Sequence, residues 1–238
     1  MRVVILVAGM GSRHKPLTNV IPKCLIEVEG KPILGHILDW VKPMDFSEIC
    51  MVVGMFRPKI EAYIRDSYDF GDKVRYVKQS NPVGTAQAVG LALVSVSESP
   101  EPVLVVLGDC VPSDSVSGIF MEWMSVPDAE KPPHSIISLR ESTEPEQSCV
   151  VNLYSPPSSC MSWVCGFDEK PESPQSNVIL SGYQYIRGGD LLFAAADRVM
   201  EDGVKVRGEF QLTSVYQSMY DYGTSFLGVF RSGEILDL

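Results

Sequence analysis

The stretch LVAGMGSR at residues 6–13 carries the side chains best suited to holding phosphate groups. Glycines let a backbone approach a phosphate with its N–H groups exposed, and a guanidinium such as that of Arg13 can clamp two phosphate oxygens. Two glycines after an apolar run also make an ordinary tight turn. His14 replaces the third glycine of a dinucleotide-binding GxGxxG loop, and Gly30-Lys31 lacks the other residues of a Walker A loop. Taken alone, the stretch is therefore compatible with an ordinary tight turn or with a phosphate site of another kind.

Three more polar residues stand at positions where they could do chemistry. Lys23 follows Pro22, Gln79 follows the apolar run 74–78, and Asp109 follows the run 103–107 and one glycine. A flexible lysine can follow moving phosphate charge, a carboxylate can carry Mg²⁺, and a glutamine amide can donate and accept hydrogen bonds at once. The alternatives are a solvated surface lysine and an aspartate that only caps the next turn.

The segments that surround Lys23 add a pattern of short motifs. RHKPLT at 13–18, PKCL at 22–25 and GKPIL at 30–34 follow the glycine loop. With that loop they resemble the sugar-phosphate nucleotidyltransferase family, the pyrophosphorylases that make nucleotide sugars, whose pattern is GxG[ST]R, PLT, PK and GKP at similar spacing. The resemblance implies catalytic roles for Arg13 and Lys23. It assigns nucleotide binding to Ala8, Gly9, Gly11 and Ser12.

The resemblance continues into the base and metal segments. The family has a glutamine five residues before Gly-[LT]-Ala, which implies that Gln79, Gly84 and Thr85 bind the nucleotide near its base, although Gly84 could simply start a helix. Gly-Asp at 108–109 resembles the motif whose aspartate carries Mg²⁺. The second carboxylate of the family lies in Trp-x-Asp, and Asp237 is the candidate here, with isoleucine in place of the tryptophan.

The acceptor segment resembles the family less uniformly. GFDEKPE at 166–172 matches FxEKP, which implies that Glu169 accepts sugar hydroxyls and Lys170 pairs with the sugar phosphate. Ser181-Gly182-Tyr183 resembles the following strand of the family, which usually has asparagine or alanine where Ser181 stands. The resemblance implies that Gly182 binds the acceptor. Ser148 and its neighbouring cysteine replace the Tyr-Gly pair common in sugar enzymes.

Taken together, the resemblance implies transfer of NMP from an NTP to a sugar 1-phosphate, with Mg²⁺ as cofactor and release of pyrophosphate. UTP or dTTP is favoured as donor, with CTP or GTP as alternatives, and a hexose 1-phosphate is the expected acceptor. A cytidylyltransferase that uses a phospho-alcohol, and a noncatalytic regulatory subunit of the same fold, remain open. A nicotinamide-dependent oxidoreductase is disfavoured by His14.

Charge and composition limit the classes of partner that the protein could bind. The net charge is −10, but residues 1–31 carry +3 and the remainder −13. An acidic surface disfavours nucleic acid and anionic membranes, because both need basic patches, while a local anion site remains compatible. No apolar run approaches the roughly 18 residues of a membrane helix. Six scattered cysteines without a CxxC pair predict reduced thiols and a cytoplasmic location, and a homo-oligomer remains open.

The elements that position these residues follow from hydrophobic patterns. Strands at 2–8, 49–54, 74–78 and 103–107 alternate with helices at 32–42, 57–66 and 84–96, which predicts βαβ units and a parallel sheet. Ligands bind at the carboxyl ends of such strands. Further strands are expected at 135–140, 148–153, 162–168, 178–186 and 224–230, and helices at 189–201 and 209–222.

The predicted fold is therefore α/β. It is a Rossmann-like three-layer domain with a mostly parallel central sheet and a more mixed, partly antiparallel C-terminal half. We expect residues 1–238 to form a single nucleotidyltransferase domain, in which about 1–125 bind the NTP and about 126–238 bind the acceptor.

Overall fold

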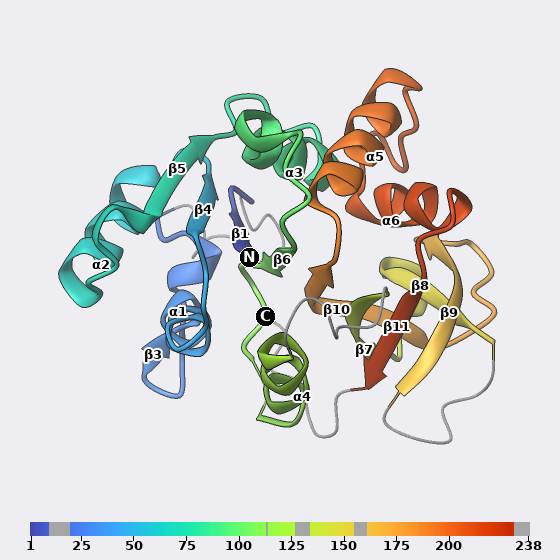
Figure 1. The fold of residues 1–238 in the computed structure, drawn as a ribbon, viewed down its shortest axis with the longest axis horizontal. Helices are drawn as coiled ribbons and strands as arrows, with labels where there is room; N and C mark the ends of the chain where they lie inside the picture. Colours follow the sequence, from blue (N-terminus) through green and yellow to red (C-terminus); the bar gives the residue numbers. More distant parts are fainter. Residues whose placement is uncertain (10–19, 113, 127–133, 155–160, 231–238) are drawn as a thin grey trace.

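A nine-stranded sheet runs through the computed structural model of the chain, which describes residues 1–9, 20–112, 114–126, 134–154 and 161–230. The strand order is β5-β4-β1-β6-β10-β7-β11-β9-β8 (Figure 1). Its strands are β1 (Arg2–Val7), β4 (Glu48–Val53), β5 (Val74–Lys78), β6 (Val103–Leu107), β7 (Ser135–Glu141), β8 (Cys149–Leu153), β9 (Met161–Glu169), β10 (Val178–Ile186) and β11 (Phe226–Phe230). A small hairpin of β2 (Glu27–Val28) and β3 (Lys31–Pro32) lies apart from it.

The first four strands of the large sheet are parallel. β1 pairs with β4 on one side and with β6 on the other, so that Leu6 lies between Val52 and Leu107. β5 pairs with β4 in the same direction. Apolar residues on both faces bury these strands, as a covered parallel sheet requires. Their carboxyl ends therefore lie along one edge of the sheet.

The remaining strands are mixed, as the sequence predicts. β10 runs antiparallel to β6 and to β7, while β11 is parallel to β7 and antiparallel to β9. β8 and β9 form an antiparallel pair. β8 also pairs with β10, where Val150 lies opposite Ile179. The sheet thus curls at this end, on the right in Figure 1.

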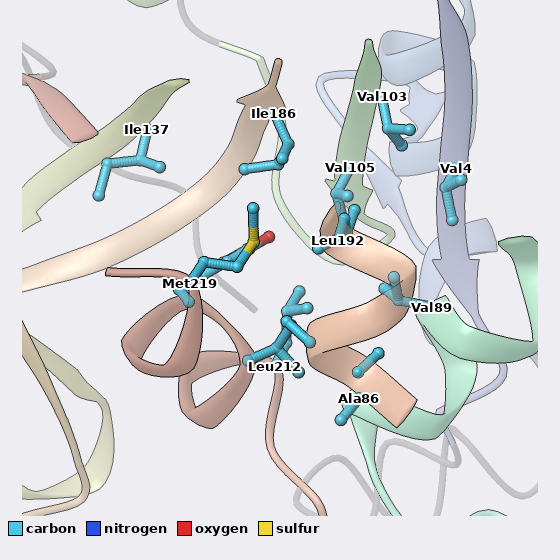
Figure 2. Close-up of a cluster of buried hydrophobic side chains, with 14 of the residues drawn as sticks. Val4, Ala86, Val89, Val103, Val105, Ile137, Ile186, Leu192, Leu212 and Met219 are labelled. Carbon is cyan, nitrogen blue, oxygen red and sulfur yellow. The ribbon is translucent and has the colours of Figure 1, made fainter. Parts of the chain in front are cut away.

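Helices cover both faces of the sheet and complete a three-layer α/β fold. One face packs against α3 (Thr85–Leu93), α5 (Gly189–Glu201) and α6 (Leu212–Asp221). Figure 2 shows this core, where Val89, Leu192 and Met219 from the three helices meet strand residues such as Val105 and Ile186. The other face packs against α1 (Ile33–Val41), α2 (Arg57–Ser67) and α4 (Asp114–Ser125).

The sequence prediction misses one helix, α4. Serines and Gly118 lower the intrinsic helix propensity of this segment. Phe120 is nevertheless fully buried against the sheet, and such packing supplies most of the stability of a short helix. No helix within the described residues is both long and apolar enough to cross a membrane.

Candidate functional site

The candidate nucleotide residues gather along the carboxyl edge of the parallel strands. Ala8 follows β1, Gln79 follows β5, and Gly108-Asp109 follows β6. Backbone hydrogen bonds fix this edge: Gly108 N donates to Leu6 O at 3.0 Å, and Gln79 N donates to Val53 O at 2.9 Å. The parallel register thus brings together residues from three separate motifs.

Two glycines allow the strand ends to pack closely. A Cβ on Gly54 would lie 2.8 Å from the carbonyl oxygen of Ala8, and a Cβ on Gly108 would lie 2.4 Å from Cγ1 of Val7. Real Cβ atoms essentially never approach other atoms below 3.0 Å. Gly54 belongs to none of the sequence motifs, and its position directly after a buried strand is the signal that could have indicated it.

Lys23 and Asp109 form an ion pair across this edge. Lys23 Nζ donates to Asp109 Oδ2 at 3.0 Å, and the side chains are 19% and 43% exposed. A single 3-10 turn, Lys23–Leu25, follows Pro22 and is anchored by the buried Cys24. Lys23 is thus mostly enclosed and not a solvated surface lysine. The fold joins two candidates that lie 86 positions apart.

Two cysteines flank this ion pair. Burial raises the pKa of the Cys24 thiol to about 12, and the negative charge of Asp109 adds to the effect. The buried Cys110 thiol donates to Asp109 Oδ1 at 3.6 Å. Because a thiol with the pKa of Cys24 stays neutral near pH 7, the charge at this position comes from Lys23 and Asp109.

Gln79 is largely buried, and its amide is held from inside the protein. Its Nε2 donates to Gly84 O and to Gln87 Oε1, both at 2.9 Å, and 7% of the residue is exposed. An amide group has only two N–H donors. With both used internally, the atom of Gln79 that remains to meet a ligand is the acceptor Oε1.

Gly84 lies where the two halves of the chain touch. Its φ is +135°, a conformation that side chains rarely adopt, and a Cβ there would lie 2.1 Å from Phe210 O. Thr85 starts α3, and its Oγ1 accepts a hydrogen bond from Leu212 N at 2.8 Å. Both candidate residues therefore contact the segment that leads into α6.

Replacing Gly84 by alanine should lower the free energy of unfolding by about 3 kcal/mol or more, because the methyl group combines backbone strain with a backbone clash. Gly203→Ala is the matched control, since its φ is +69° but nothing lies within 4 Å of the new Cβ. That variant should lose only about 1–2 kcal/mol. Urea unfolding of both variants checks this, and equal losses would contradict the close contact at Gly84.

Glu169 and Lys170 lie together at the end of β9. Glu169 Oε2 accepts from Thr213 Oγ1 at 2.6 Å, and Oε1 pairs with Lys170 Nζ at 3.1 Å. Their side chains are 9% and 18% exposed. Lys170 N donates to Ser148 O at 2.9 Å, so the segment that departs from the sugar-enzyme pattern supports the lysine backbone. A carboxylate has about four acceptor positions, so Glu169 keeps capacity for a ligand.

Arg207, which belongs to none of the sequence motifs, lies beside the same segment. Its Nη2 donates to Glu146 O at 3.2 Å and its Nη1 to Gln147 Oε1 at 3.4 Å. The residue has φ +49° in a turn closed by mutual hydrogen bonds between Val206 and Glu209. In the sequence, the feature that could have indicated Arg207 is an arginine that directly precedes a glycine in a short turn. A second cation thus lies next to the residues that hold Lys170.

Gly182, within β10, packs closely against the turn that carries Asp109. A Cβ at this position would lie 2.4 Å from Cβ of Cys110. The neighbouring Tyr183 hydroxyl donates to Cys110 O at 3.1 Å. The strand that the sequence assigns to the acceptor therefore packs directly against the candidate metal turn.

A cavity of about 420 Å³ lies between β9, α5 and α6. Its lining includes Glu169 and Thr213 together with Arg198, Asp202 and Tyr222. Neither Lys23, Asp109 nor Gln79 lines it. The cavity is therefore separate from the edge where the candidate phosphate residues lie.

Gly11, Ser12, Arg13 and Asp237 lie outside the described residues. Among the residues that are described, no cluster of three or more His, Cys, Asp or Glu side chains could hold a metal ion. A metal at Asp109 would therefore need ligands other than such a cluster.

Comparisons with known proteins identify the family. The family model described as Nucleotidyl transferase matches residues 2–233. A glucose-1-phosphate thymidylyltransferase of Streptomyces griseus is 29% identical over 98% of this chain and 61% of its own length. A UTP–glucose-1-phosphate uridylyltransferase of Haloferax volcanii is 26% identical over 100% of this chain and 91% of its own. The chain spans about three fifths of the length of several curated relatives.

The fold comparison agrees. A solved UDP-glucose pyrophosphorylase in complex with UDP-glucose superposes with a TM-score of 0.79 at 18% identity, covering 99% of this chain and 92% of that one. These matches confirm the predicted fold class and the resemblance that the motifs indicate. Because the family model spans nearly the whole sequence, the chain belongs to the nucleotidyl transferase family.

Proposed function

We propose that this chain transfers NMP from an NTP to a sugar 1-phosphate, forming a nucleotide sugar and releasing pyrophosphate. The observation that carries the proposal is the Lys23–Asp109 pair at the carboxyl edge of the parallel strands, 3.0 Å between Nζ and Oδ2. A cation and a carboxylate at such an edge suit a phosphate ligand and its metal. The names of the two relatives above, which act on glucose 1-phosphate, support the acceptor class.

The proposed chemistry needs little from a general base. An acceptor phosphate oxygen, already an anion, bonds to the α-phosphorus while the bond from that phosphorus to the bridging oxygen breaks. The electron pair of the broken bond leaves with pyrophosphate, so no proton has to move. Catalysis then rests on in-line placement and charge neutralisation. Lys23, and Arg13 by the motif, are the cations proposed for this role.

Asp109 fits the requirements of a Mg²⁺ ligand. Its carboxylate is 43% exposed on a turn that Gly108 and Gly182 pack in place, so water and phosphate oxygens can complete the coordination. Mg²⁺ typically keeps several waters and needs only one or two protein carboxylates. Asp237 is the proposed second carboxylate. When bound there, Mg²⁺ would neutralise phosphate charge.

The internal hydrogen bonds that fix the Gln79 amide favour bases that offer it a hydrogen-bond donor. Because both of its N–H groups are used inside the protein, it offers an acceptor to the base. Uracil and thymine can meet this acceptor with a ring N–H donor, and guanine carries a ring N–H as well, whereas cytosine would have to use its exocyclic amino group because its matching ring nitrogen is an acceptor. UTP or dTTP is therefore the proposed donor, with CTP or GTP as alternatives.

The acceptor side combines a carboxylate with two cations. Glu169 is proposed to accept hydrogen bonds from sugar hydroxyls, while Lys170 and Arg207 supply positive charge for the acceptor phosphate. A hexose 1-phosphate matches this set of groups. The thiols of Cys24, Cys50, Cys149 and Cys165 are not joined in disulfides, which supports the proposal of a reducing, cytoplasmic compartment.

A substrate matrix tests the proposal directly. UTP, dTTP, CTP, GTP and ATP are each combined with hexose 1-phosphates and with phospho-alcohols, and pyrophosphate release is measured with Mg²⁺ present. We expect the fastest release with UTP or dTTP and a hexose 1-phosphate. Release only with CTP and a phospho-alcohol would favour a cytidylyltransferase, and no release from any pair would favour a noncatalytic subunit.

Glu169→Gln should raise the KM for the sugar phosphate about ten- to hundredfold, the effect of weakening a hydrogen bond to a charged group. The KM for the NTP should hardly change, because Glu169 lies on the acceptor side. Glu172→Gln, at an exposed position on the same segment, is the matched control and should behave like the wild type. Equal sugar KM values in the two variants would contradict the assigned role of Glu169.

A further inference from the structure

Two segments from opposite halves of the chain are joined next to the proposed site. Phe210 N donates to Val83 O at 2.8 Å, and Ala86 N donates to Phe210 O at 2.9 Å. Thr85 Oγ1 accepts from Leu212 N at 2.8 Å, which satisfies a free N–H at the start of α6. The residues around Gly84 and those leading into α6 are thus held together by backbone and side-chain hydrogen bonds.

Each side of this junction contacts a proposed substrate residue. On the NTP side, Gln79 Nε2 donates to Gly84 O at 2.9 Å. On the acceptor side, Thr213, the second residue of α6, donates from Oγ1 to Glu169 Oε2 at 2.6 Å. The helix that carries Thr213 is locked in the core, since Leu212 is 5% exposed and Val215 is fully buried.

We propose that Thr213 is a positioning residue that holds the Glu169 carboxylate in the orientation required by the acceptor. This inference rests on the proposed function and adds a residue to it. Thr213 itself is 5% exposed and does not need to touch the substrate. Its effect would pass through one hydrogen bond, and the junction at Thr85 fixes it relative to the NTP side of the site.

The surroundings of Glu169 explain why this donor matters. Apart from Lys170, Thr213 is the donor that the described residues bring to the carboxylate. Without the hydroxyl, the carboxylate would be drawn toward Lys170, which is the group proposed to meet the acceptor phosphate. Cys149 lies opposite Glu169 on the neighbouring strand β8, and burial raises the pKa of its thiol well above its usual range, to which the charge of Glu169 adds. The thiol therefore stays protonated, but an S–H group is only a weak donor, so Cys149 is a poor substitute for the lost hydroxyl.

The test compares Thr213→Val with Thr213→Ser. Valine matches threonine in shape but has no hydroxyl, whereas serine keeps it. In Thr213→Val we expect the KM for the hexose 1-phosphate to rise about five- to tenfold, as for loss of one hydrogen bond, with the KM for the NTP unchanged. Thr213→Ser should restore the acceptor KM to within about twofold of wild type, because its hydroxyl can make the same bond. Thr224→Val, the same change outside the site, is the control and should leave both constants unchanged.

A double variant separates positioning from a general structural role. Added to Glu169→Gln, Thr213→Val should raise the acceptor KM less than it does in the wild type, because the two residues act through one interaction. Direct calorimetric binding of the hexose 1-phosphate provides a second readout, and thermal unfolding verifies that each variant is folded at the assay temperature.

The outcomes are distinguishable. If the wild type is active and Thr213→Val keeps the wild-type acceptor KM and affinity, the positioning role is wrong while the proposed function stands. Equal defects in the serine and valine variants, or additive effects with Glu169→Gln, would also overturn it. If the wild type releases no pyrophosphate from any substrate pair and binds no hexose 1-phosphate, the proposed function fails and this inference fails with it.

Discussion

Lys23→Ala should lower the turnover number about a hundredfold or more, the usual scale for loss of one electrostatic stabiliser in an active site. Lys23 is 19% exposed and lies 3.0 Å from Asp109, so its ammonium is held at the strand edge where the phosphates are proposed to bind. Charge that develops on the leaving pyrophosphate would have one cation fewer to balance it. The KM values should change less than the turnover number, because the lost interaction strengthens in the transition state.

Steady-state pyrophosphate release measures this effect, and a matched variant controls for loss of positive charge. Lys42→Ala removes an exposed lysine just after α1, on the connection that leads into the amino end of β4 and not at the carboxyl edge. It should keep wild-type rates. Lys23→Ala should remain folded, because the carboxylate it leaves unpaired is 43% exposed and can be hydrated. A folded Lys23→Ala protein with wild-type turnover would show that Lys23 has no catalytic role.

Much of the fold could be predicted because its local patterns agree with its tertiary structure. The run Val103–Leu107 is apolar on both faces, as a central parallel strand must be, and the structure places β6 there. The predicted helix at 209–222 begins only at Leu212, since the preceding residues pair with Val83 and close a turn. Helix α4 was missed because its stability comes from burial of Phe120 and not from propensity.

The site could be predicted only in part, for a physical reason. Motifs mark residues that suit phosphate chemistry, such as Lys23 and Asp109, and the parallel topology explains why they can meet. Thr213 carries no such mark, because a threonine early in an amphipathic helix is a common feature. Its relation to Glu169 depends on how α6 packs against β9, and no sequence spacing encodes that contact. Gly54 shows the same limit, since its neighbour Ala8 follows a different strand, β1.

Asp109→Asn should lower turnover about a hundredfold at an Mg²⁺ concentration that saturates the wild type, because an amide is a much weaker ligand for a hard cation than a carboxylate. Chelation of divalent cations should abolish wild-type activity, and added Mg²⁺ should restore it. Asp45→Asn, at an exposed position, is the matched control and should keep the wild-type Mg²⁺ dependence. Full wild-type activity under chelation would show that no metal is required.

The Lys23 contact gives Asp109 a second explanation, and an Mg²⁺ titration separates the two. If the carboxylate serves mainly to hold Lys23, the asparagine variant should stay slow at every Mg²⁺ concentration, because Mg²⁺ cannot replace an ion pair that orients a lysine. If the carboxylate binds the metal, the activity curve of the variant should move to higher Mg²⁺ by about tenfold or more and recover part of the lost rate. We expect the second result.

Direct Mn²⁺ binding, measured without substrates, should weaken in Asp109→Asn but not in Lys23→Ala, where loss of a neighbouring positive charge should strengthen it. Unchanged Mn²⁺ affinity in the asparagine variant would remove Asp109 from the metal site.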